Sequence, residues 1–149
     1  MVTFIREHHV MTLATSSGSN LPWCASCFYA YIDDRNWFVF TSDDDTRHGR
    51  EMLANPNVAV CIALETKITG RIRGIQMAGL ARKASGEDLP LASKSFLRQF
   101  PIAMLKKTTL WIFEPDHIKM TDNRLGFGKK LVWNRSAQPD KTASDTRPF

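Results

Sequence analysis

Several features of exported and membrane proteins are missing from this sequence of 149 residues. Its three cysteines are an odd number and too few for a disulfide framework, which fits a reducing compartment. No apolar run approaches the ~20 residues that cross a bilayer. The start of the chain shows no basic segment leading into an apolar stretch, as a secretory leader would. We therefore expect a cytoplasmic protein with no membrane span.

Motifs of metal sites and hydrolases are also scarce. The four histidines show neither metal-ligand spacing nor an H-E-x-x-H pattern. The C-x-x-C formed by Cys24 and Cys27 falls within an expected strand, where residues three apart point to opposite faces. Their Cα atoms would lie about 10 Å apart, whereas a disulfide needs less than about 7 Å. We predict no metal site and only a structural role for this cysteine pair.

Charge is not concentrated in any segment. The chain carries 20 Lys and Arg against 15 Asp and Glu, a formal net charge of +5. The basic residues occur in scattered pairs, without a basic helix or an aromatic-interleaved stripe. This distribution is typical of a solvated surface, or of a pocket for one small phosphorylated ligand. It disfavours nucleic-acid binding, which stays as an alternative.

Short apolar runs between turn-rich segments dominate the chain. Strands are expected at residues 10–15, 23–32, 37–41, 57–64, 72–84, 109–113, 117–121 and 130–134, with a turn at 114–116. Helices are expected at residues 1–9, at 47–54, and over about three to four turns before Pro101, where residues 85–88 resemble a capping box. Because regular βαβ alternation is absent, the pattern favours a mainly β fold, an antiparallel barrel with peripheral helices. We expect this domain to span 1–135, with a disordered polar tail over 136–149.

The fourth and fifth expected strands bear on assembly and shape. Residues 57–64 alternate large and small apolar side chains, so both faces of this strand are expected to be buried. One small barrel does not need a strand that is apolar on both sides, and we therefore expect a homodimer with a large apolar interface. Gly74 and Gly79 in the next strand predict bends or a close approach of backbones, as at a barrel corner.

A group of polar residues lies where the third strand leads into the helix at 47–54. The group consists of Thr41, Ser42, Thr46, Arg47 and His48. Free backbone N–H groups and the helix dipole favour an anion there, and arginine adds a bidentate partner for phosphate. The intervening Asp43-Asp44-Asp45 argues the other way, because aspartate at a helix start commonly serves only as a cap. From this segment alone, capping and phosphate binding both stay open.

Further stretches complete a pattern. They are residues 38–41 with Thr46-Arg47-His48 and 55–60, then 74–79, then 111–120 with Asn123-Arg124-Leu125. Together these stretches resemble the pyridoxamine 5'-phosphate oxidase family of FMN-binding split barrels, over roughly residues 3–135. Within that superfamily, Thr46-Arg47-His48 and residues 121–130 are most similar to the uncharacterised YhbP-like bacterial proteins.

The resemblance implies a cofactor, an assembly and site residues. Members of the family are homodimers with two FMN sites at the subunit interface, and the flavin performs the redox chemistry. By this resemblance, Thr41, Thr46, Arg47 and His48 lie at the FMN phosphate, and Gln76 contacts the flavin ring. Arg124 is the expected substrate-binding residue, and no catalytic residue is implied.

The sequence also departs from the oxidases. Residues 26–31 lack the Arg and Lys of their second strand, and Gly126-Phe127-Gly128 replaces the histidine that follows their Asn-Arg-Leu. We therefore expect an FMN-binding protein, a flavin-dependent oxidoreductase acting on an unknown small substrate other than pyridoxine phosphate. The alternatives are a non-catalytic flavin- or haem-binding or sensing module, and a basic nucleic-acid-binding barrel.

Overall fold

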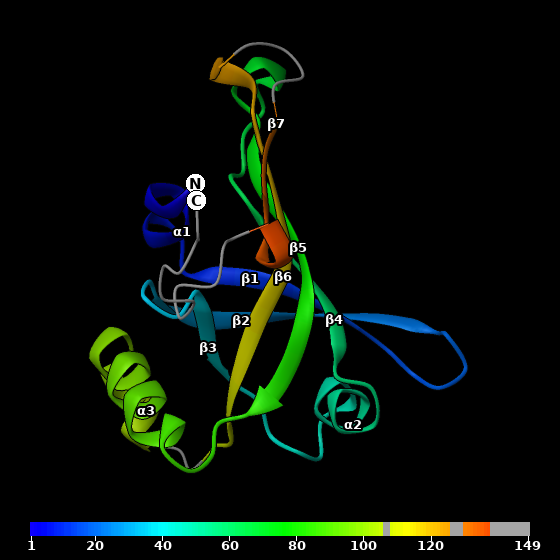
Figure 1. Ribbon diagram of the computed structural model, residues 1–149, viewed down its shortest axis with the longest axis vertical. Coiled ribbons are helices and arrows are strands. Elements are labelled where there is room, and N and C mark those ends of the chain that lie inside the picture. The colour runs from blue at the N-terminus through cyan, green and yellow to red at the C-terminus, as the bar shows by residue number, and fades with distance from the viewer. Residues whose placement is uncertain (106–107, 126–129, 138–149) are drawn as a thin grey trace, which may run out of the picture.

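The fold is one antiparallel sheet that curls into a barrel (Figure 1). The computed structural model describes residues 1–105, 108–125 and 130–137. Within these residues the strands are β1 (Val10–Ser16), β2 (Pro22–Ile32), β3 (Trp37–Thr41), β4 (Asn57–Ala63), β5 (Arg73–Lys83), β6 (Leu110–Asp122) and β7 (Lys130–Asn134). The strand order is β3-β2-β1-β4-β5-β6-β7, and β3 also pairs with β6, which closes six strands into the expected antiparallel barrel.

Helices cover the end and one side of the barrel (Figure 1). They are α1 (Val2–Glu7), α2 (Arg47–Ala54) and α3 (Asp88–Gln99), and the 3₁₀ turns are η1 (Thr69–Arg71), η2 (Pro101–Leu105), η3 (Asn123–Leu125) and η4 (Arg135–Ala137). Helix α2 contacts β1, β2 and β5 at one end of the barrel, while α3 packs outside β2, β3 and β6. Across the described ranges, no helix is both long enough and apolar enough to span a membrane.

Apolar residues form two cores, one on each side of the barrel wall. Phe38 and Phe113 belong to the core inside the barrel. Val39 and Ile112 belong to the second core, where Phe96 of α3 packs against the outside of the wall. Because side chains alternate between the two faces of a strand, β3 and the facing part of β6 are buried on both sides.

The predicted turn at residues 114–116 is wrong, since 109–113 and 117–121 belong to one continuous strand, β6. Pro115 cannot donate to a ladder, yet it lies opposite Gly79, where the β5–β6 register shifts at a bulge. A Cβ on Gly79 would sit 2.1 Å from the Glu114 carbonyl oxygen and 2.7 Å from Pro115 Cα. The close approach expected at Gly79 is thus confirmed, and it allows a proline inside the strand.

The expectation that both faces of β4 are buried is also wrong for a single chain. Its inward-facing valines and Ile62 are buried in the barrel. On the other face Ala59 and Ala63 are exposed, and Cys61 is half-buried. The small side chains of β4 therefore form part of an open surface.

Three smaller expectations have mixed outcomes. The capping box predicted at Ser85 does not form, because α3 begins at Asp88 and Glu87 makes no side-chain cap hydrogen bond. The predicted orientation of the C-x-x-C is confirmed, since Cys24 is exposed and Cys27 is buried. The predicted tail lies outside the described residues from residue 138 onwards.

Candidate functional site

The loop before α2 is tied to the first turn of the helix. Thr46 is the N-cap: its Oγ1 accepts a hydrogen bond from the Gly49 N–H at 3.0 Å and donates to the Asp43 carbonyl at 2.8 Å. A Cβ on Gly49 would sit 2.4 Å from that same carbonyl oxygen, so loop and helix approach here because residue 49 is glycine. Trp111 Nε1 donates to the Ser42 carbonyl at 3.2 Å and fixes the loop to the barrel. These contacts fix the position of the first N–H groups of α2, which have no carbonyl partner within the helix.

Arg47 is held by two partners, Glu51 on its own helix and Trp23 of β2. Its Nε donates to Glu51 Oε1 at 2.9 Å, and its guanidinium carbon lies 4.4 Å from the centre of the Trp23 ring. Glu51 is almost buried and also accepts a hydrogen bond from Thr15 Oγ1 at 2.5 Å. These hydrogen bonds, from Thr15 and then from Arg47, lower the pKa of the Glu51 carboxyl. The contact with Glu51 uses one donor of the guanidinium and leaves its terminal amino groups for another partner.

The acidic run before α2 does not act as one block of negative charge. Asp44 Oδ2 accepts a hydrogen bond from Lys83 Nζ, at the end of β5, at 2.5 Å. This contact lowers the pKa of the Asp44 carboxyl and compensates its charge. Lys83 of β5 thus compensates part of the negative charge that precedes Arg47 in the sequence.

His48 is half-buried beside Arg47 on the first turn of α2. Burial lowers the pKa of its imidazole from 6.5, and the nearby Glu51 opposes this effect only in part. Near pH 7 the ring is therefore mostly uncharged. It contributes hydrogen-bonding capacity to this turn rather than a second positive charge.

Thr41 and Gln76 lie on the outside of the barrel wall. Thr41 lines an apolar groove of about 570 Å³ together with Phe28, Phe96 and Phe100. Gln76 is exposed on β5 and pairs with Cys61 of β4. The pairing of β4 with β1 and of β1 with β2 continues this row across the wall, through Thr12 and Ser26.

Twelve of the outward positions of β1, β2, β4 and β5 form a surface that we name the outer face; the outward Arg82 near the end of β5 is not counted in it and is paired with Glu114 and Asp88. The outer face consists of Val10, Thr12, Ala14, Cys24, Ser26, Phe28, Ala59, Cys61, Ala63, Gln76, Ala78 and Leu80. None of these twelve side chains is charged, and most are small. Val10 and Phe28 are 47% and 59% exposed. In a protein with 23% charged residues, a surface of this kind is suited to contact with another apolar surface.

Arg124 lies far from the predicted site residues at α2 of the same chain. It forms a bidentate ion pair with Asp122, with Nε and Nη2 at 3.0 and 2.8 Å from the two carboxylate oxygens. This contact lowers the pKa of the Asp122 carboxyl to about 2. Asp122 pairs with Arg73 at the start of β5, whereas Lys83 at its other end lies near α2. At about 3.3 Å per residue, these two ends are roughly 33 Å apart.

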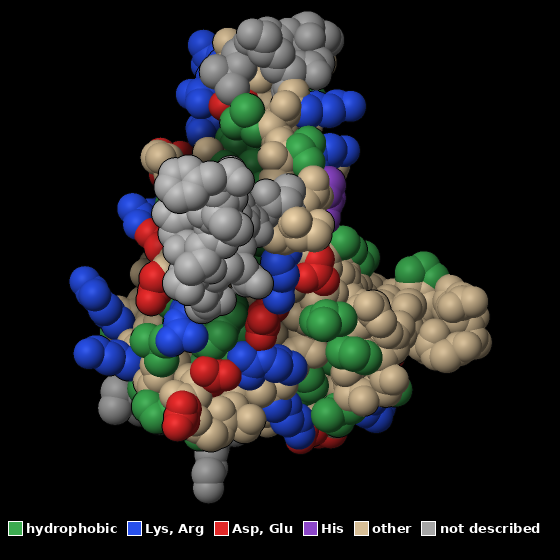
Figure 2. All heavy atoms as spheres, in the orientation of Figure 1, with side chains coloured by type: hydrophobic (Ala, Val, Ile, Leu, Met, Phe, Trp, Pro, Cys, Tyr) green, Lys and Arg blue, Asp and Glu red, His purple; other side chains and the backbone are tan. Residues whose placement is uncertain are grey.

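The charged surface shows no single basic patch on the face in view. Figure 2 shows lysines and arginines spread over this face, with acidic side chains among them. Within the described residues, no group of three or more His, Cys, Asp or Glu side chains is arranged to hold a metal ion. Among the described residues, the best-formed polar site is the one at the first turn of α2.

Comparison with known proteins gives the family. The sequence profile of the pyridoxamine 5'-phosphate oxidase family matches residues 1–122. A UPF0306 protein of Photorhabdus laumondii is 41% identical over 132 residues, covering 89% of this chain and 92% of the relative. A UPF0306 protein of Yersinia pestis is 40% identical, covering 89% of both chains.

Solved structures share the fold at low sequence identity. A haem-binding protein from Mycobacterium smegmatis superposes with a TM-score of 0.76 and 20% identity, over 89% of this chain but 55% of that longer one. HutZ, a haem storage protein from Vibrio cholerae, has a TM-score of 0.66 and 15% identity, over 76% of this chain and 86% of HutZ. A pyridoxamine 5'-phosphate oxidase-related FMN-binding protein from Nostoc punctiforme has a TM-score of 0.59 and 15% identity, over 85% of this chain and 81% of that one. The chain thus belongs to the pyridoxamine 5'-phosphate oxidase family, within its UPF0306 (YhbP-like) branch, and has the split-barrel fold.

Proposed function

We propose that the protein binds FMN, with the phosphate at the first turn of α2, and acts as a flavin-dependent oxidoreductase on a small substrate. The observation that carries this proposal is the arrangement of Arg47, which Glu51 and Trp23 hold beside a helix start capped by Thr46. A pre-oriented guanidinium next to free backbone N–H groups is suited to a phosphate monoester.

One further predicted residue, Gln76, is suited to the ring of a flavin bound in this way. Thr46, Arg47 and the first N–H groups of α2 would hold the phosphate, and the Gln76 amide would hydrogen-bond to the polar edge of the ring. Gln76 lies on the outer face, whose uncharged side chains suit a flat and largely apolar ring. When bound, FMN supplies the capacity to accept or donate a hydride. The role of the protein is then to bind the cofactor, orient it and exclude water.

FMN should bind with a stoichiometry of one per chain and at least tenfold more tightly than riboflavin, because riboflavin lacks the phosphate that Arg47 recognises. Titration of the apo-protein, followed by quenching of flavin fluorescence, measures both affinities. The two flavins differ only in the phosphate, so each is the control for the other. Equal affinities would place the recognition elsewhere and contradict the proposal.

We also propose that two chains pack through their outer faces. Exposed apolar side chains such as Val10 and Phe28, on a surface without charge, favour burial against a second copy. Light scattering should therefore give the mass of a dimer at micromolar concentration. Ala78→Glu, in the middle of the outer face, should shift the equilibrium to the monomer, whereas Leu131→Glu on β7 should not. A monomeric unmodified protein would refute this arrangement.

Pyridoxine phosphate should not be a substrate. A phosphorylated substrate needs an anion site separate from that of the cofactor. Arg124, the expected anchor, is already held by both oxygens of Asp122 and lies at the far end of β5 in its own chain. We expect no pyridoxal phosphate from FMN-loaded protein supplied with pyridoxine or pyridoxamine phosphate. Turnover comparable to that of a genuine oxidase, assayed in parallel, would show this expectation to be wrong.

A second candidate function is haem binding in the apolar groove beside Thr41. The rings of Phe28 and Phe100 line this groove, and the His9 ring lies edge-on to Phe100 at 6.5 Å. Since His9 Nδ1 faces Gln99 Nε2 at 3.3 Å, the other ring nitrogen is left as a ligand of the type that binds haem iron. Haemin titration of the unmodified apo-protein and of the His9→Ala variant separates the two candidates. Haem binding should be lost in the variant, whereas FMN binding should be unchanged, because His9 is not part of the proposed FMN site.

A further inference from the structure

A lysine lies beside the residue that is proposed to hold the flavin ring. Gln76 on β5 is directly opposite Lys119 on β6, in the register in which these two strands pair. Residues opposite each other in an antiparallel pair have Cβ atoms about 5 Å apart. Lysine carries its ammonium group on a flexible four-carbon chain. A group that contacts the Gln76 amide is therefore also within reach of the Lys119 ammonium, provided that both side chains point to the same side of the barrel wall.

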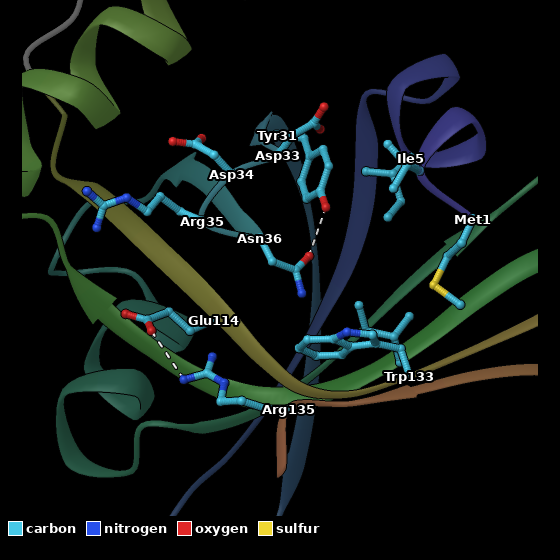
Figure 3. A pocket seen from close by; sticks show the side chains of 12 residues that line it. Met1, Ile5, Tyr31, Asp33, Asp34, Arg35, Asn36, Glu114, Trp133 and Arg135 are labelled. Atoms are coloured by element: carbon cyan, nitrogen blue, oxygen red, sulfur yellow. Dashed lines mark hydrogen bonds and ion pairs between the residues drawn. The ribbon is translucent and has the colours of Figure 1, made fainter. Parts of the chain in front are cut away.

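Both side chains point to the outer side of the wall. Gln76 is exposed on the outer face, while its neighbour Met77 is buried inside the barrel. On β6, the residue before Lys119 is Ile118, which is buried and pairs with Trp133 of β7. Both line a pocket of about 470 Å³ at the inner side of the barrel mouth, and Figure 3 shows the Trp133 ring in it. Because side chains alternate along a strand, the half-buried Lys119 points away from this pocket, to the side of Gln76.

The charged groups around Lys119 do not compensate it. The three carboxylates of strands β4 to β7 are all paired with arginines: Glu114 with Arg82 at 2.6 Å, Asp116 with Arg135 at 3.1 Å and Asp122 with Arg124 at 2.8 Å. Among the described residues, Lys119 itself has no hydrogen-bond or ion-pair partner. Lys130 of β7 and His117 of β6 point to the same side, and both are basic side chains. Glu65, beyond the end of β4, is four residues or about 13 Å from the β4 partner of Gln76.

A flavin ring held at Gln76 becomes negatively charged when it is reduced. A hydride, which is two electrons and one proton, bonds to N5 of the ring, and the neutral ring becomes an anion. The added charge lies mainly at N1 and the adjacent carbonyl, on the polar edge that an amide such as Gln76 recognises. A positive charge near this edge stabilises reduced FMN more than oxidised FMN, and so raises the reduction potential of the cofactor.

We propose that Lys119 lies at the polar edge of FMN and raises the reduction potential of the bound cofactor. This inference rests on the proposed FMN site and adds a direction to it, since the site then favours acceptance of a hydride, from a donor such as a reduced nicotinamide. Gln76 orients the ring in both redox states, because its amide is neutral, whereas the ammonium of Lys119 distinguishes the two states. Cover by the outer face of a second chain would strengthen this effect, because charges interact more strongly in less polar surroundings.

Spectroelectrochemical titration of the FMN-loaded protein tests the proposal. Lys119→Met removes the charge and keeps a long, unbranched side chain. It should lower the midpoint potential of bound FMN by about 30 mV, which is a tenfold loss of preference for reduced over oxidised FMN. The dissociation constant of oxidised FMN, from fluorescence quenching, should change less than about threefold. Lys119→Arg keeps the charge and should retain most of the potential.

Lys94→Met is the matched control, because it removes an exposed lysine from α3, away from the outer face, and should leave the potential unchanged. If the unmodified protein binds no FMN, the proposed function fails and this inference fails with it. If FMN binds and Lys119→Met keeps the potential of the unmodified protein, only this inference is overturned. An equal fall in Lys119→Arg and Lys119→Met would also overturn it, because packing rather than charge would then set the potential.

Discussion

Gly79→Ala should lower the free energy of unfolding by about 3 kcal/mol, near the upper end of the range for overpacked sites. The added Cβ would meet the Glu114 carbonyl oxygen at 2.1 Å and Pro115 Cα at 2.7 Å, and both are backbone atoms. No side chain can rotate away to make room. β5 and β6 must therefore separate at the bulge, between strands that form much of the barrel wall. For a chain of this size the melting temperature should fall by roughly 6–12 °C.

Urea denaturation at a fixed protein concentration measures this effect, because the stability of the proposed dimer would depend on concentration. Gly70→Ala is the matched control, since a Cβ at that position would meet nothing within 4 Å. We expect the control to stay within about 0.5 kcal/mol of the unmodified protein. Equal midpoints for the two variants would show that the strands adapt to the extra methyl group without cost.

Arg47→Ala should weaken FMN binding about ten- to hundredfold, the effect of losing a charge-assisted hydrogen bond worth about 1.5–3 kcal/mol. The same change removes a partner of the nearly buried Glu51, which lowers stability as well. Riboflavin separates the two effects, because it shares the ring but has no phosphate. If Arg47 binds phosphate, its loss weakens FMN and leaves riboflavin nearly unchanged.

Two variants make this test specific. Arg50→Ala removes an exposed arginine from the same helix, and it should leave the affinity for FMN within about twofold of the original. Arg47→Lys keeps the charge but not the planar fork, so it should restore only part of the affinity. A parallel loss of FMN and riboflavin in Arg47→Ala would assign Arg47 a purely structural role.

The local parts of the candidate site could be predicted from the sequence. The helix at 47–54 and the position of Arg47 at its first turn follow from a short segment, whereas the sequence leaves Asp45 and Thr46 as alternative caps and the structure has Thr46. The i,i+4 spacing of Arg47 and Glu51 also indicates an ion pair on a helix. Trp23 and Thr15 could not be predicted, because they come from strands whose register against α2 depends on the whole barrel.

Long-range features explain the remaining errors. The open face of β4 has the same small apolar residues as a buried face, since the sequence pattern does not show whether a second surface covers it. Pro115 indicated a turn, and only its pairing with Gly79 across the bulge explains why the strand continues. Because β6 runs on for 13 residues, Arg124 lies at the far end of the barrel from Arg47.

The closure of β3 onto β6 also limits how this chain associates with others. Each of the six barrel strands has a neighbouring strand on both sides, but residues 22–28 of β2 pair only with β1, because β3 pairs with β2 from Tyr29 to Ile32. Another edge in the described part of the chain is β7, which is five residues long and begins with Lys130. Short edges that carry lysine are poor templates for edge-to-edge pairing. Backbone pairing with another chain is therefore limited to such short stretches, and most of the barrel wall can be recognised only through its side chains.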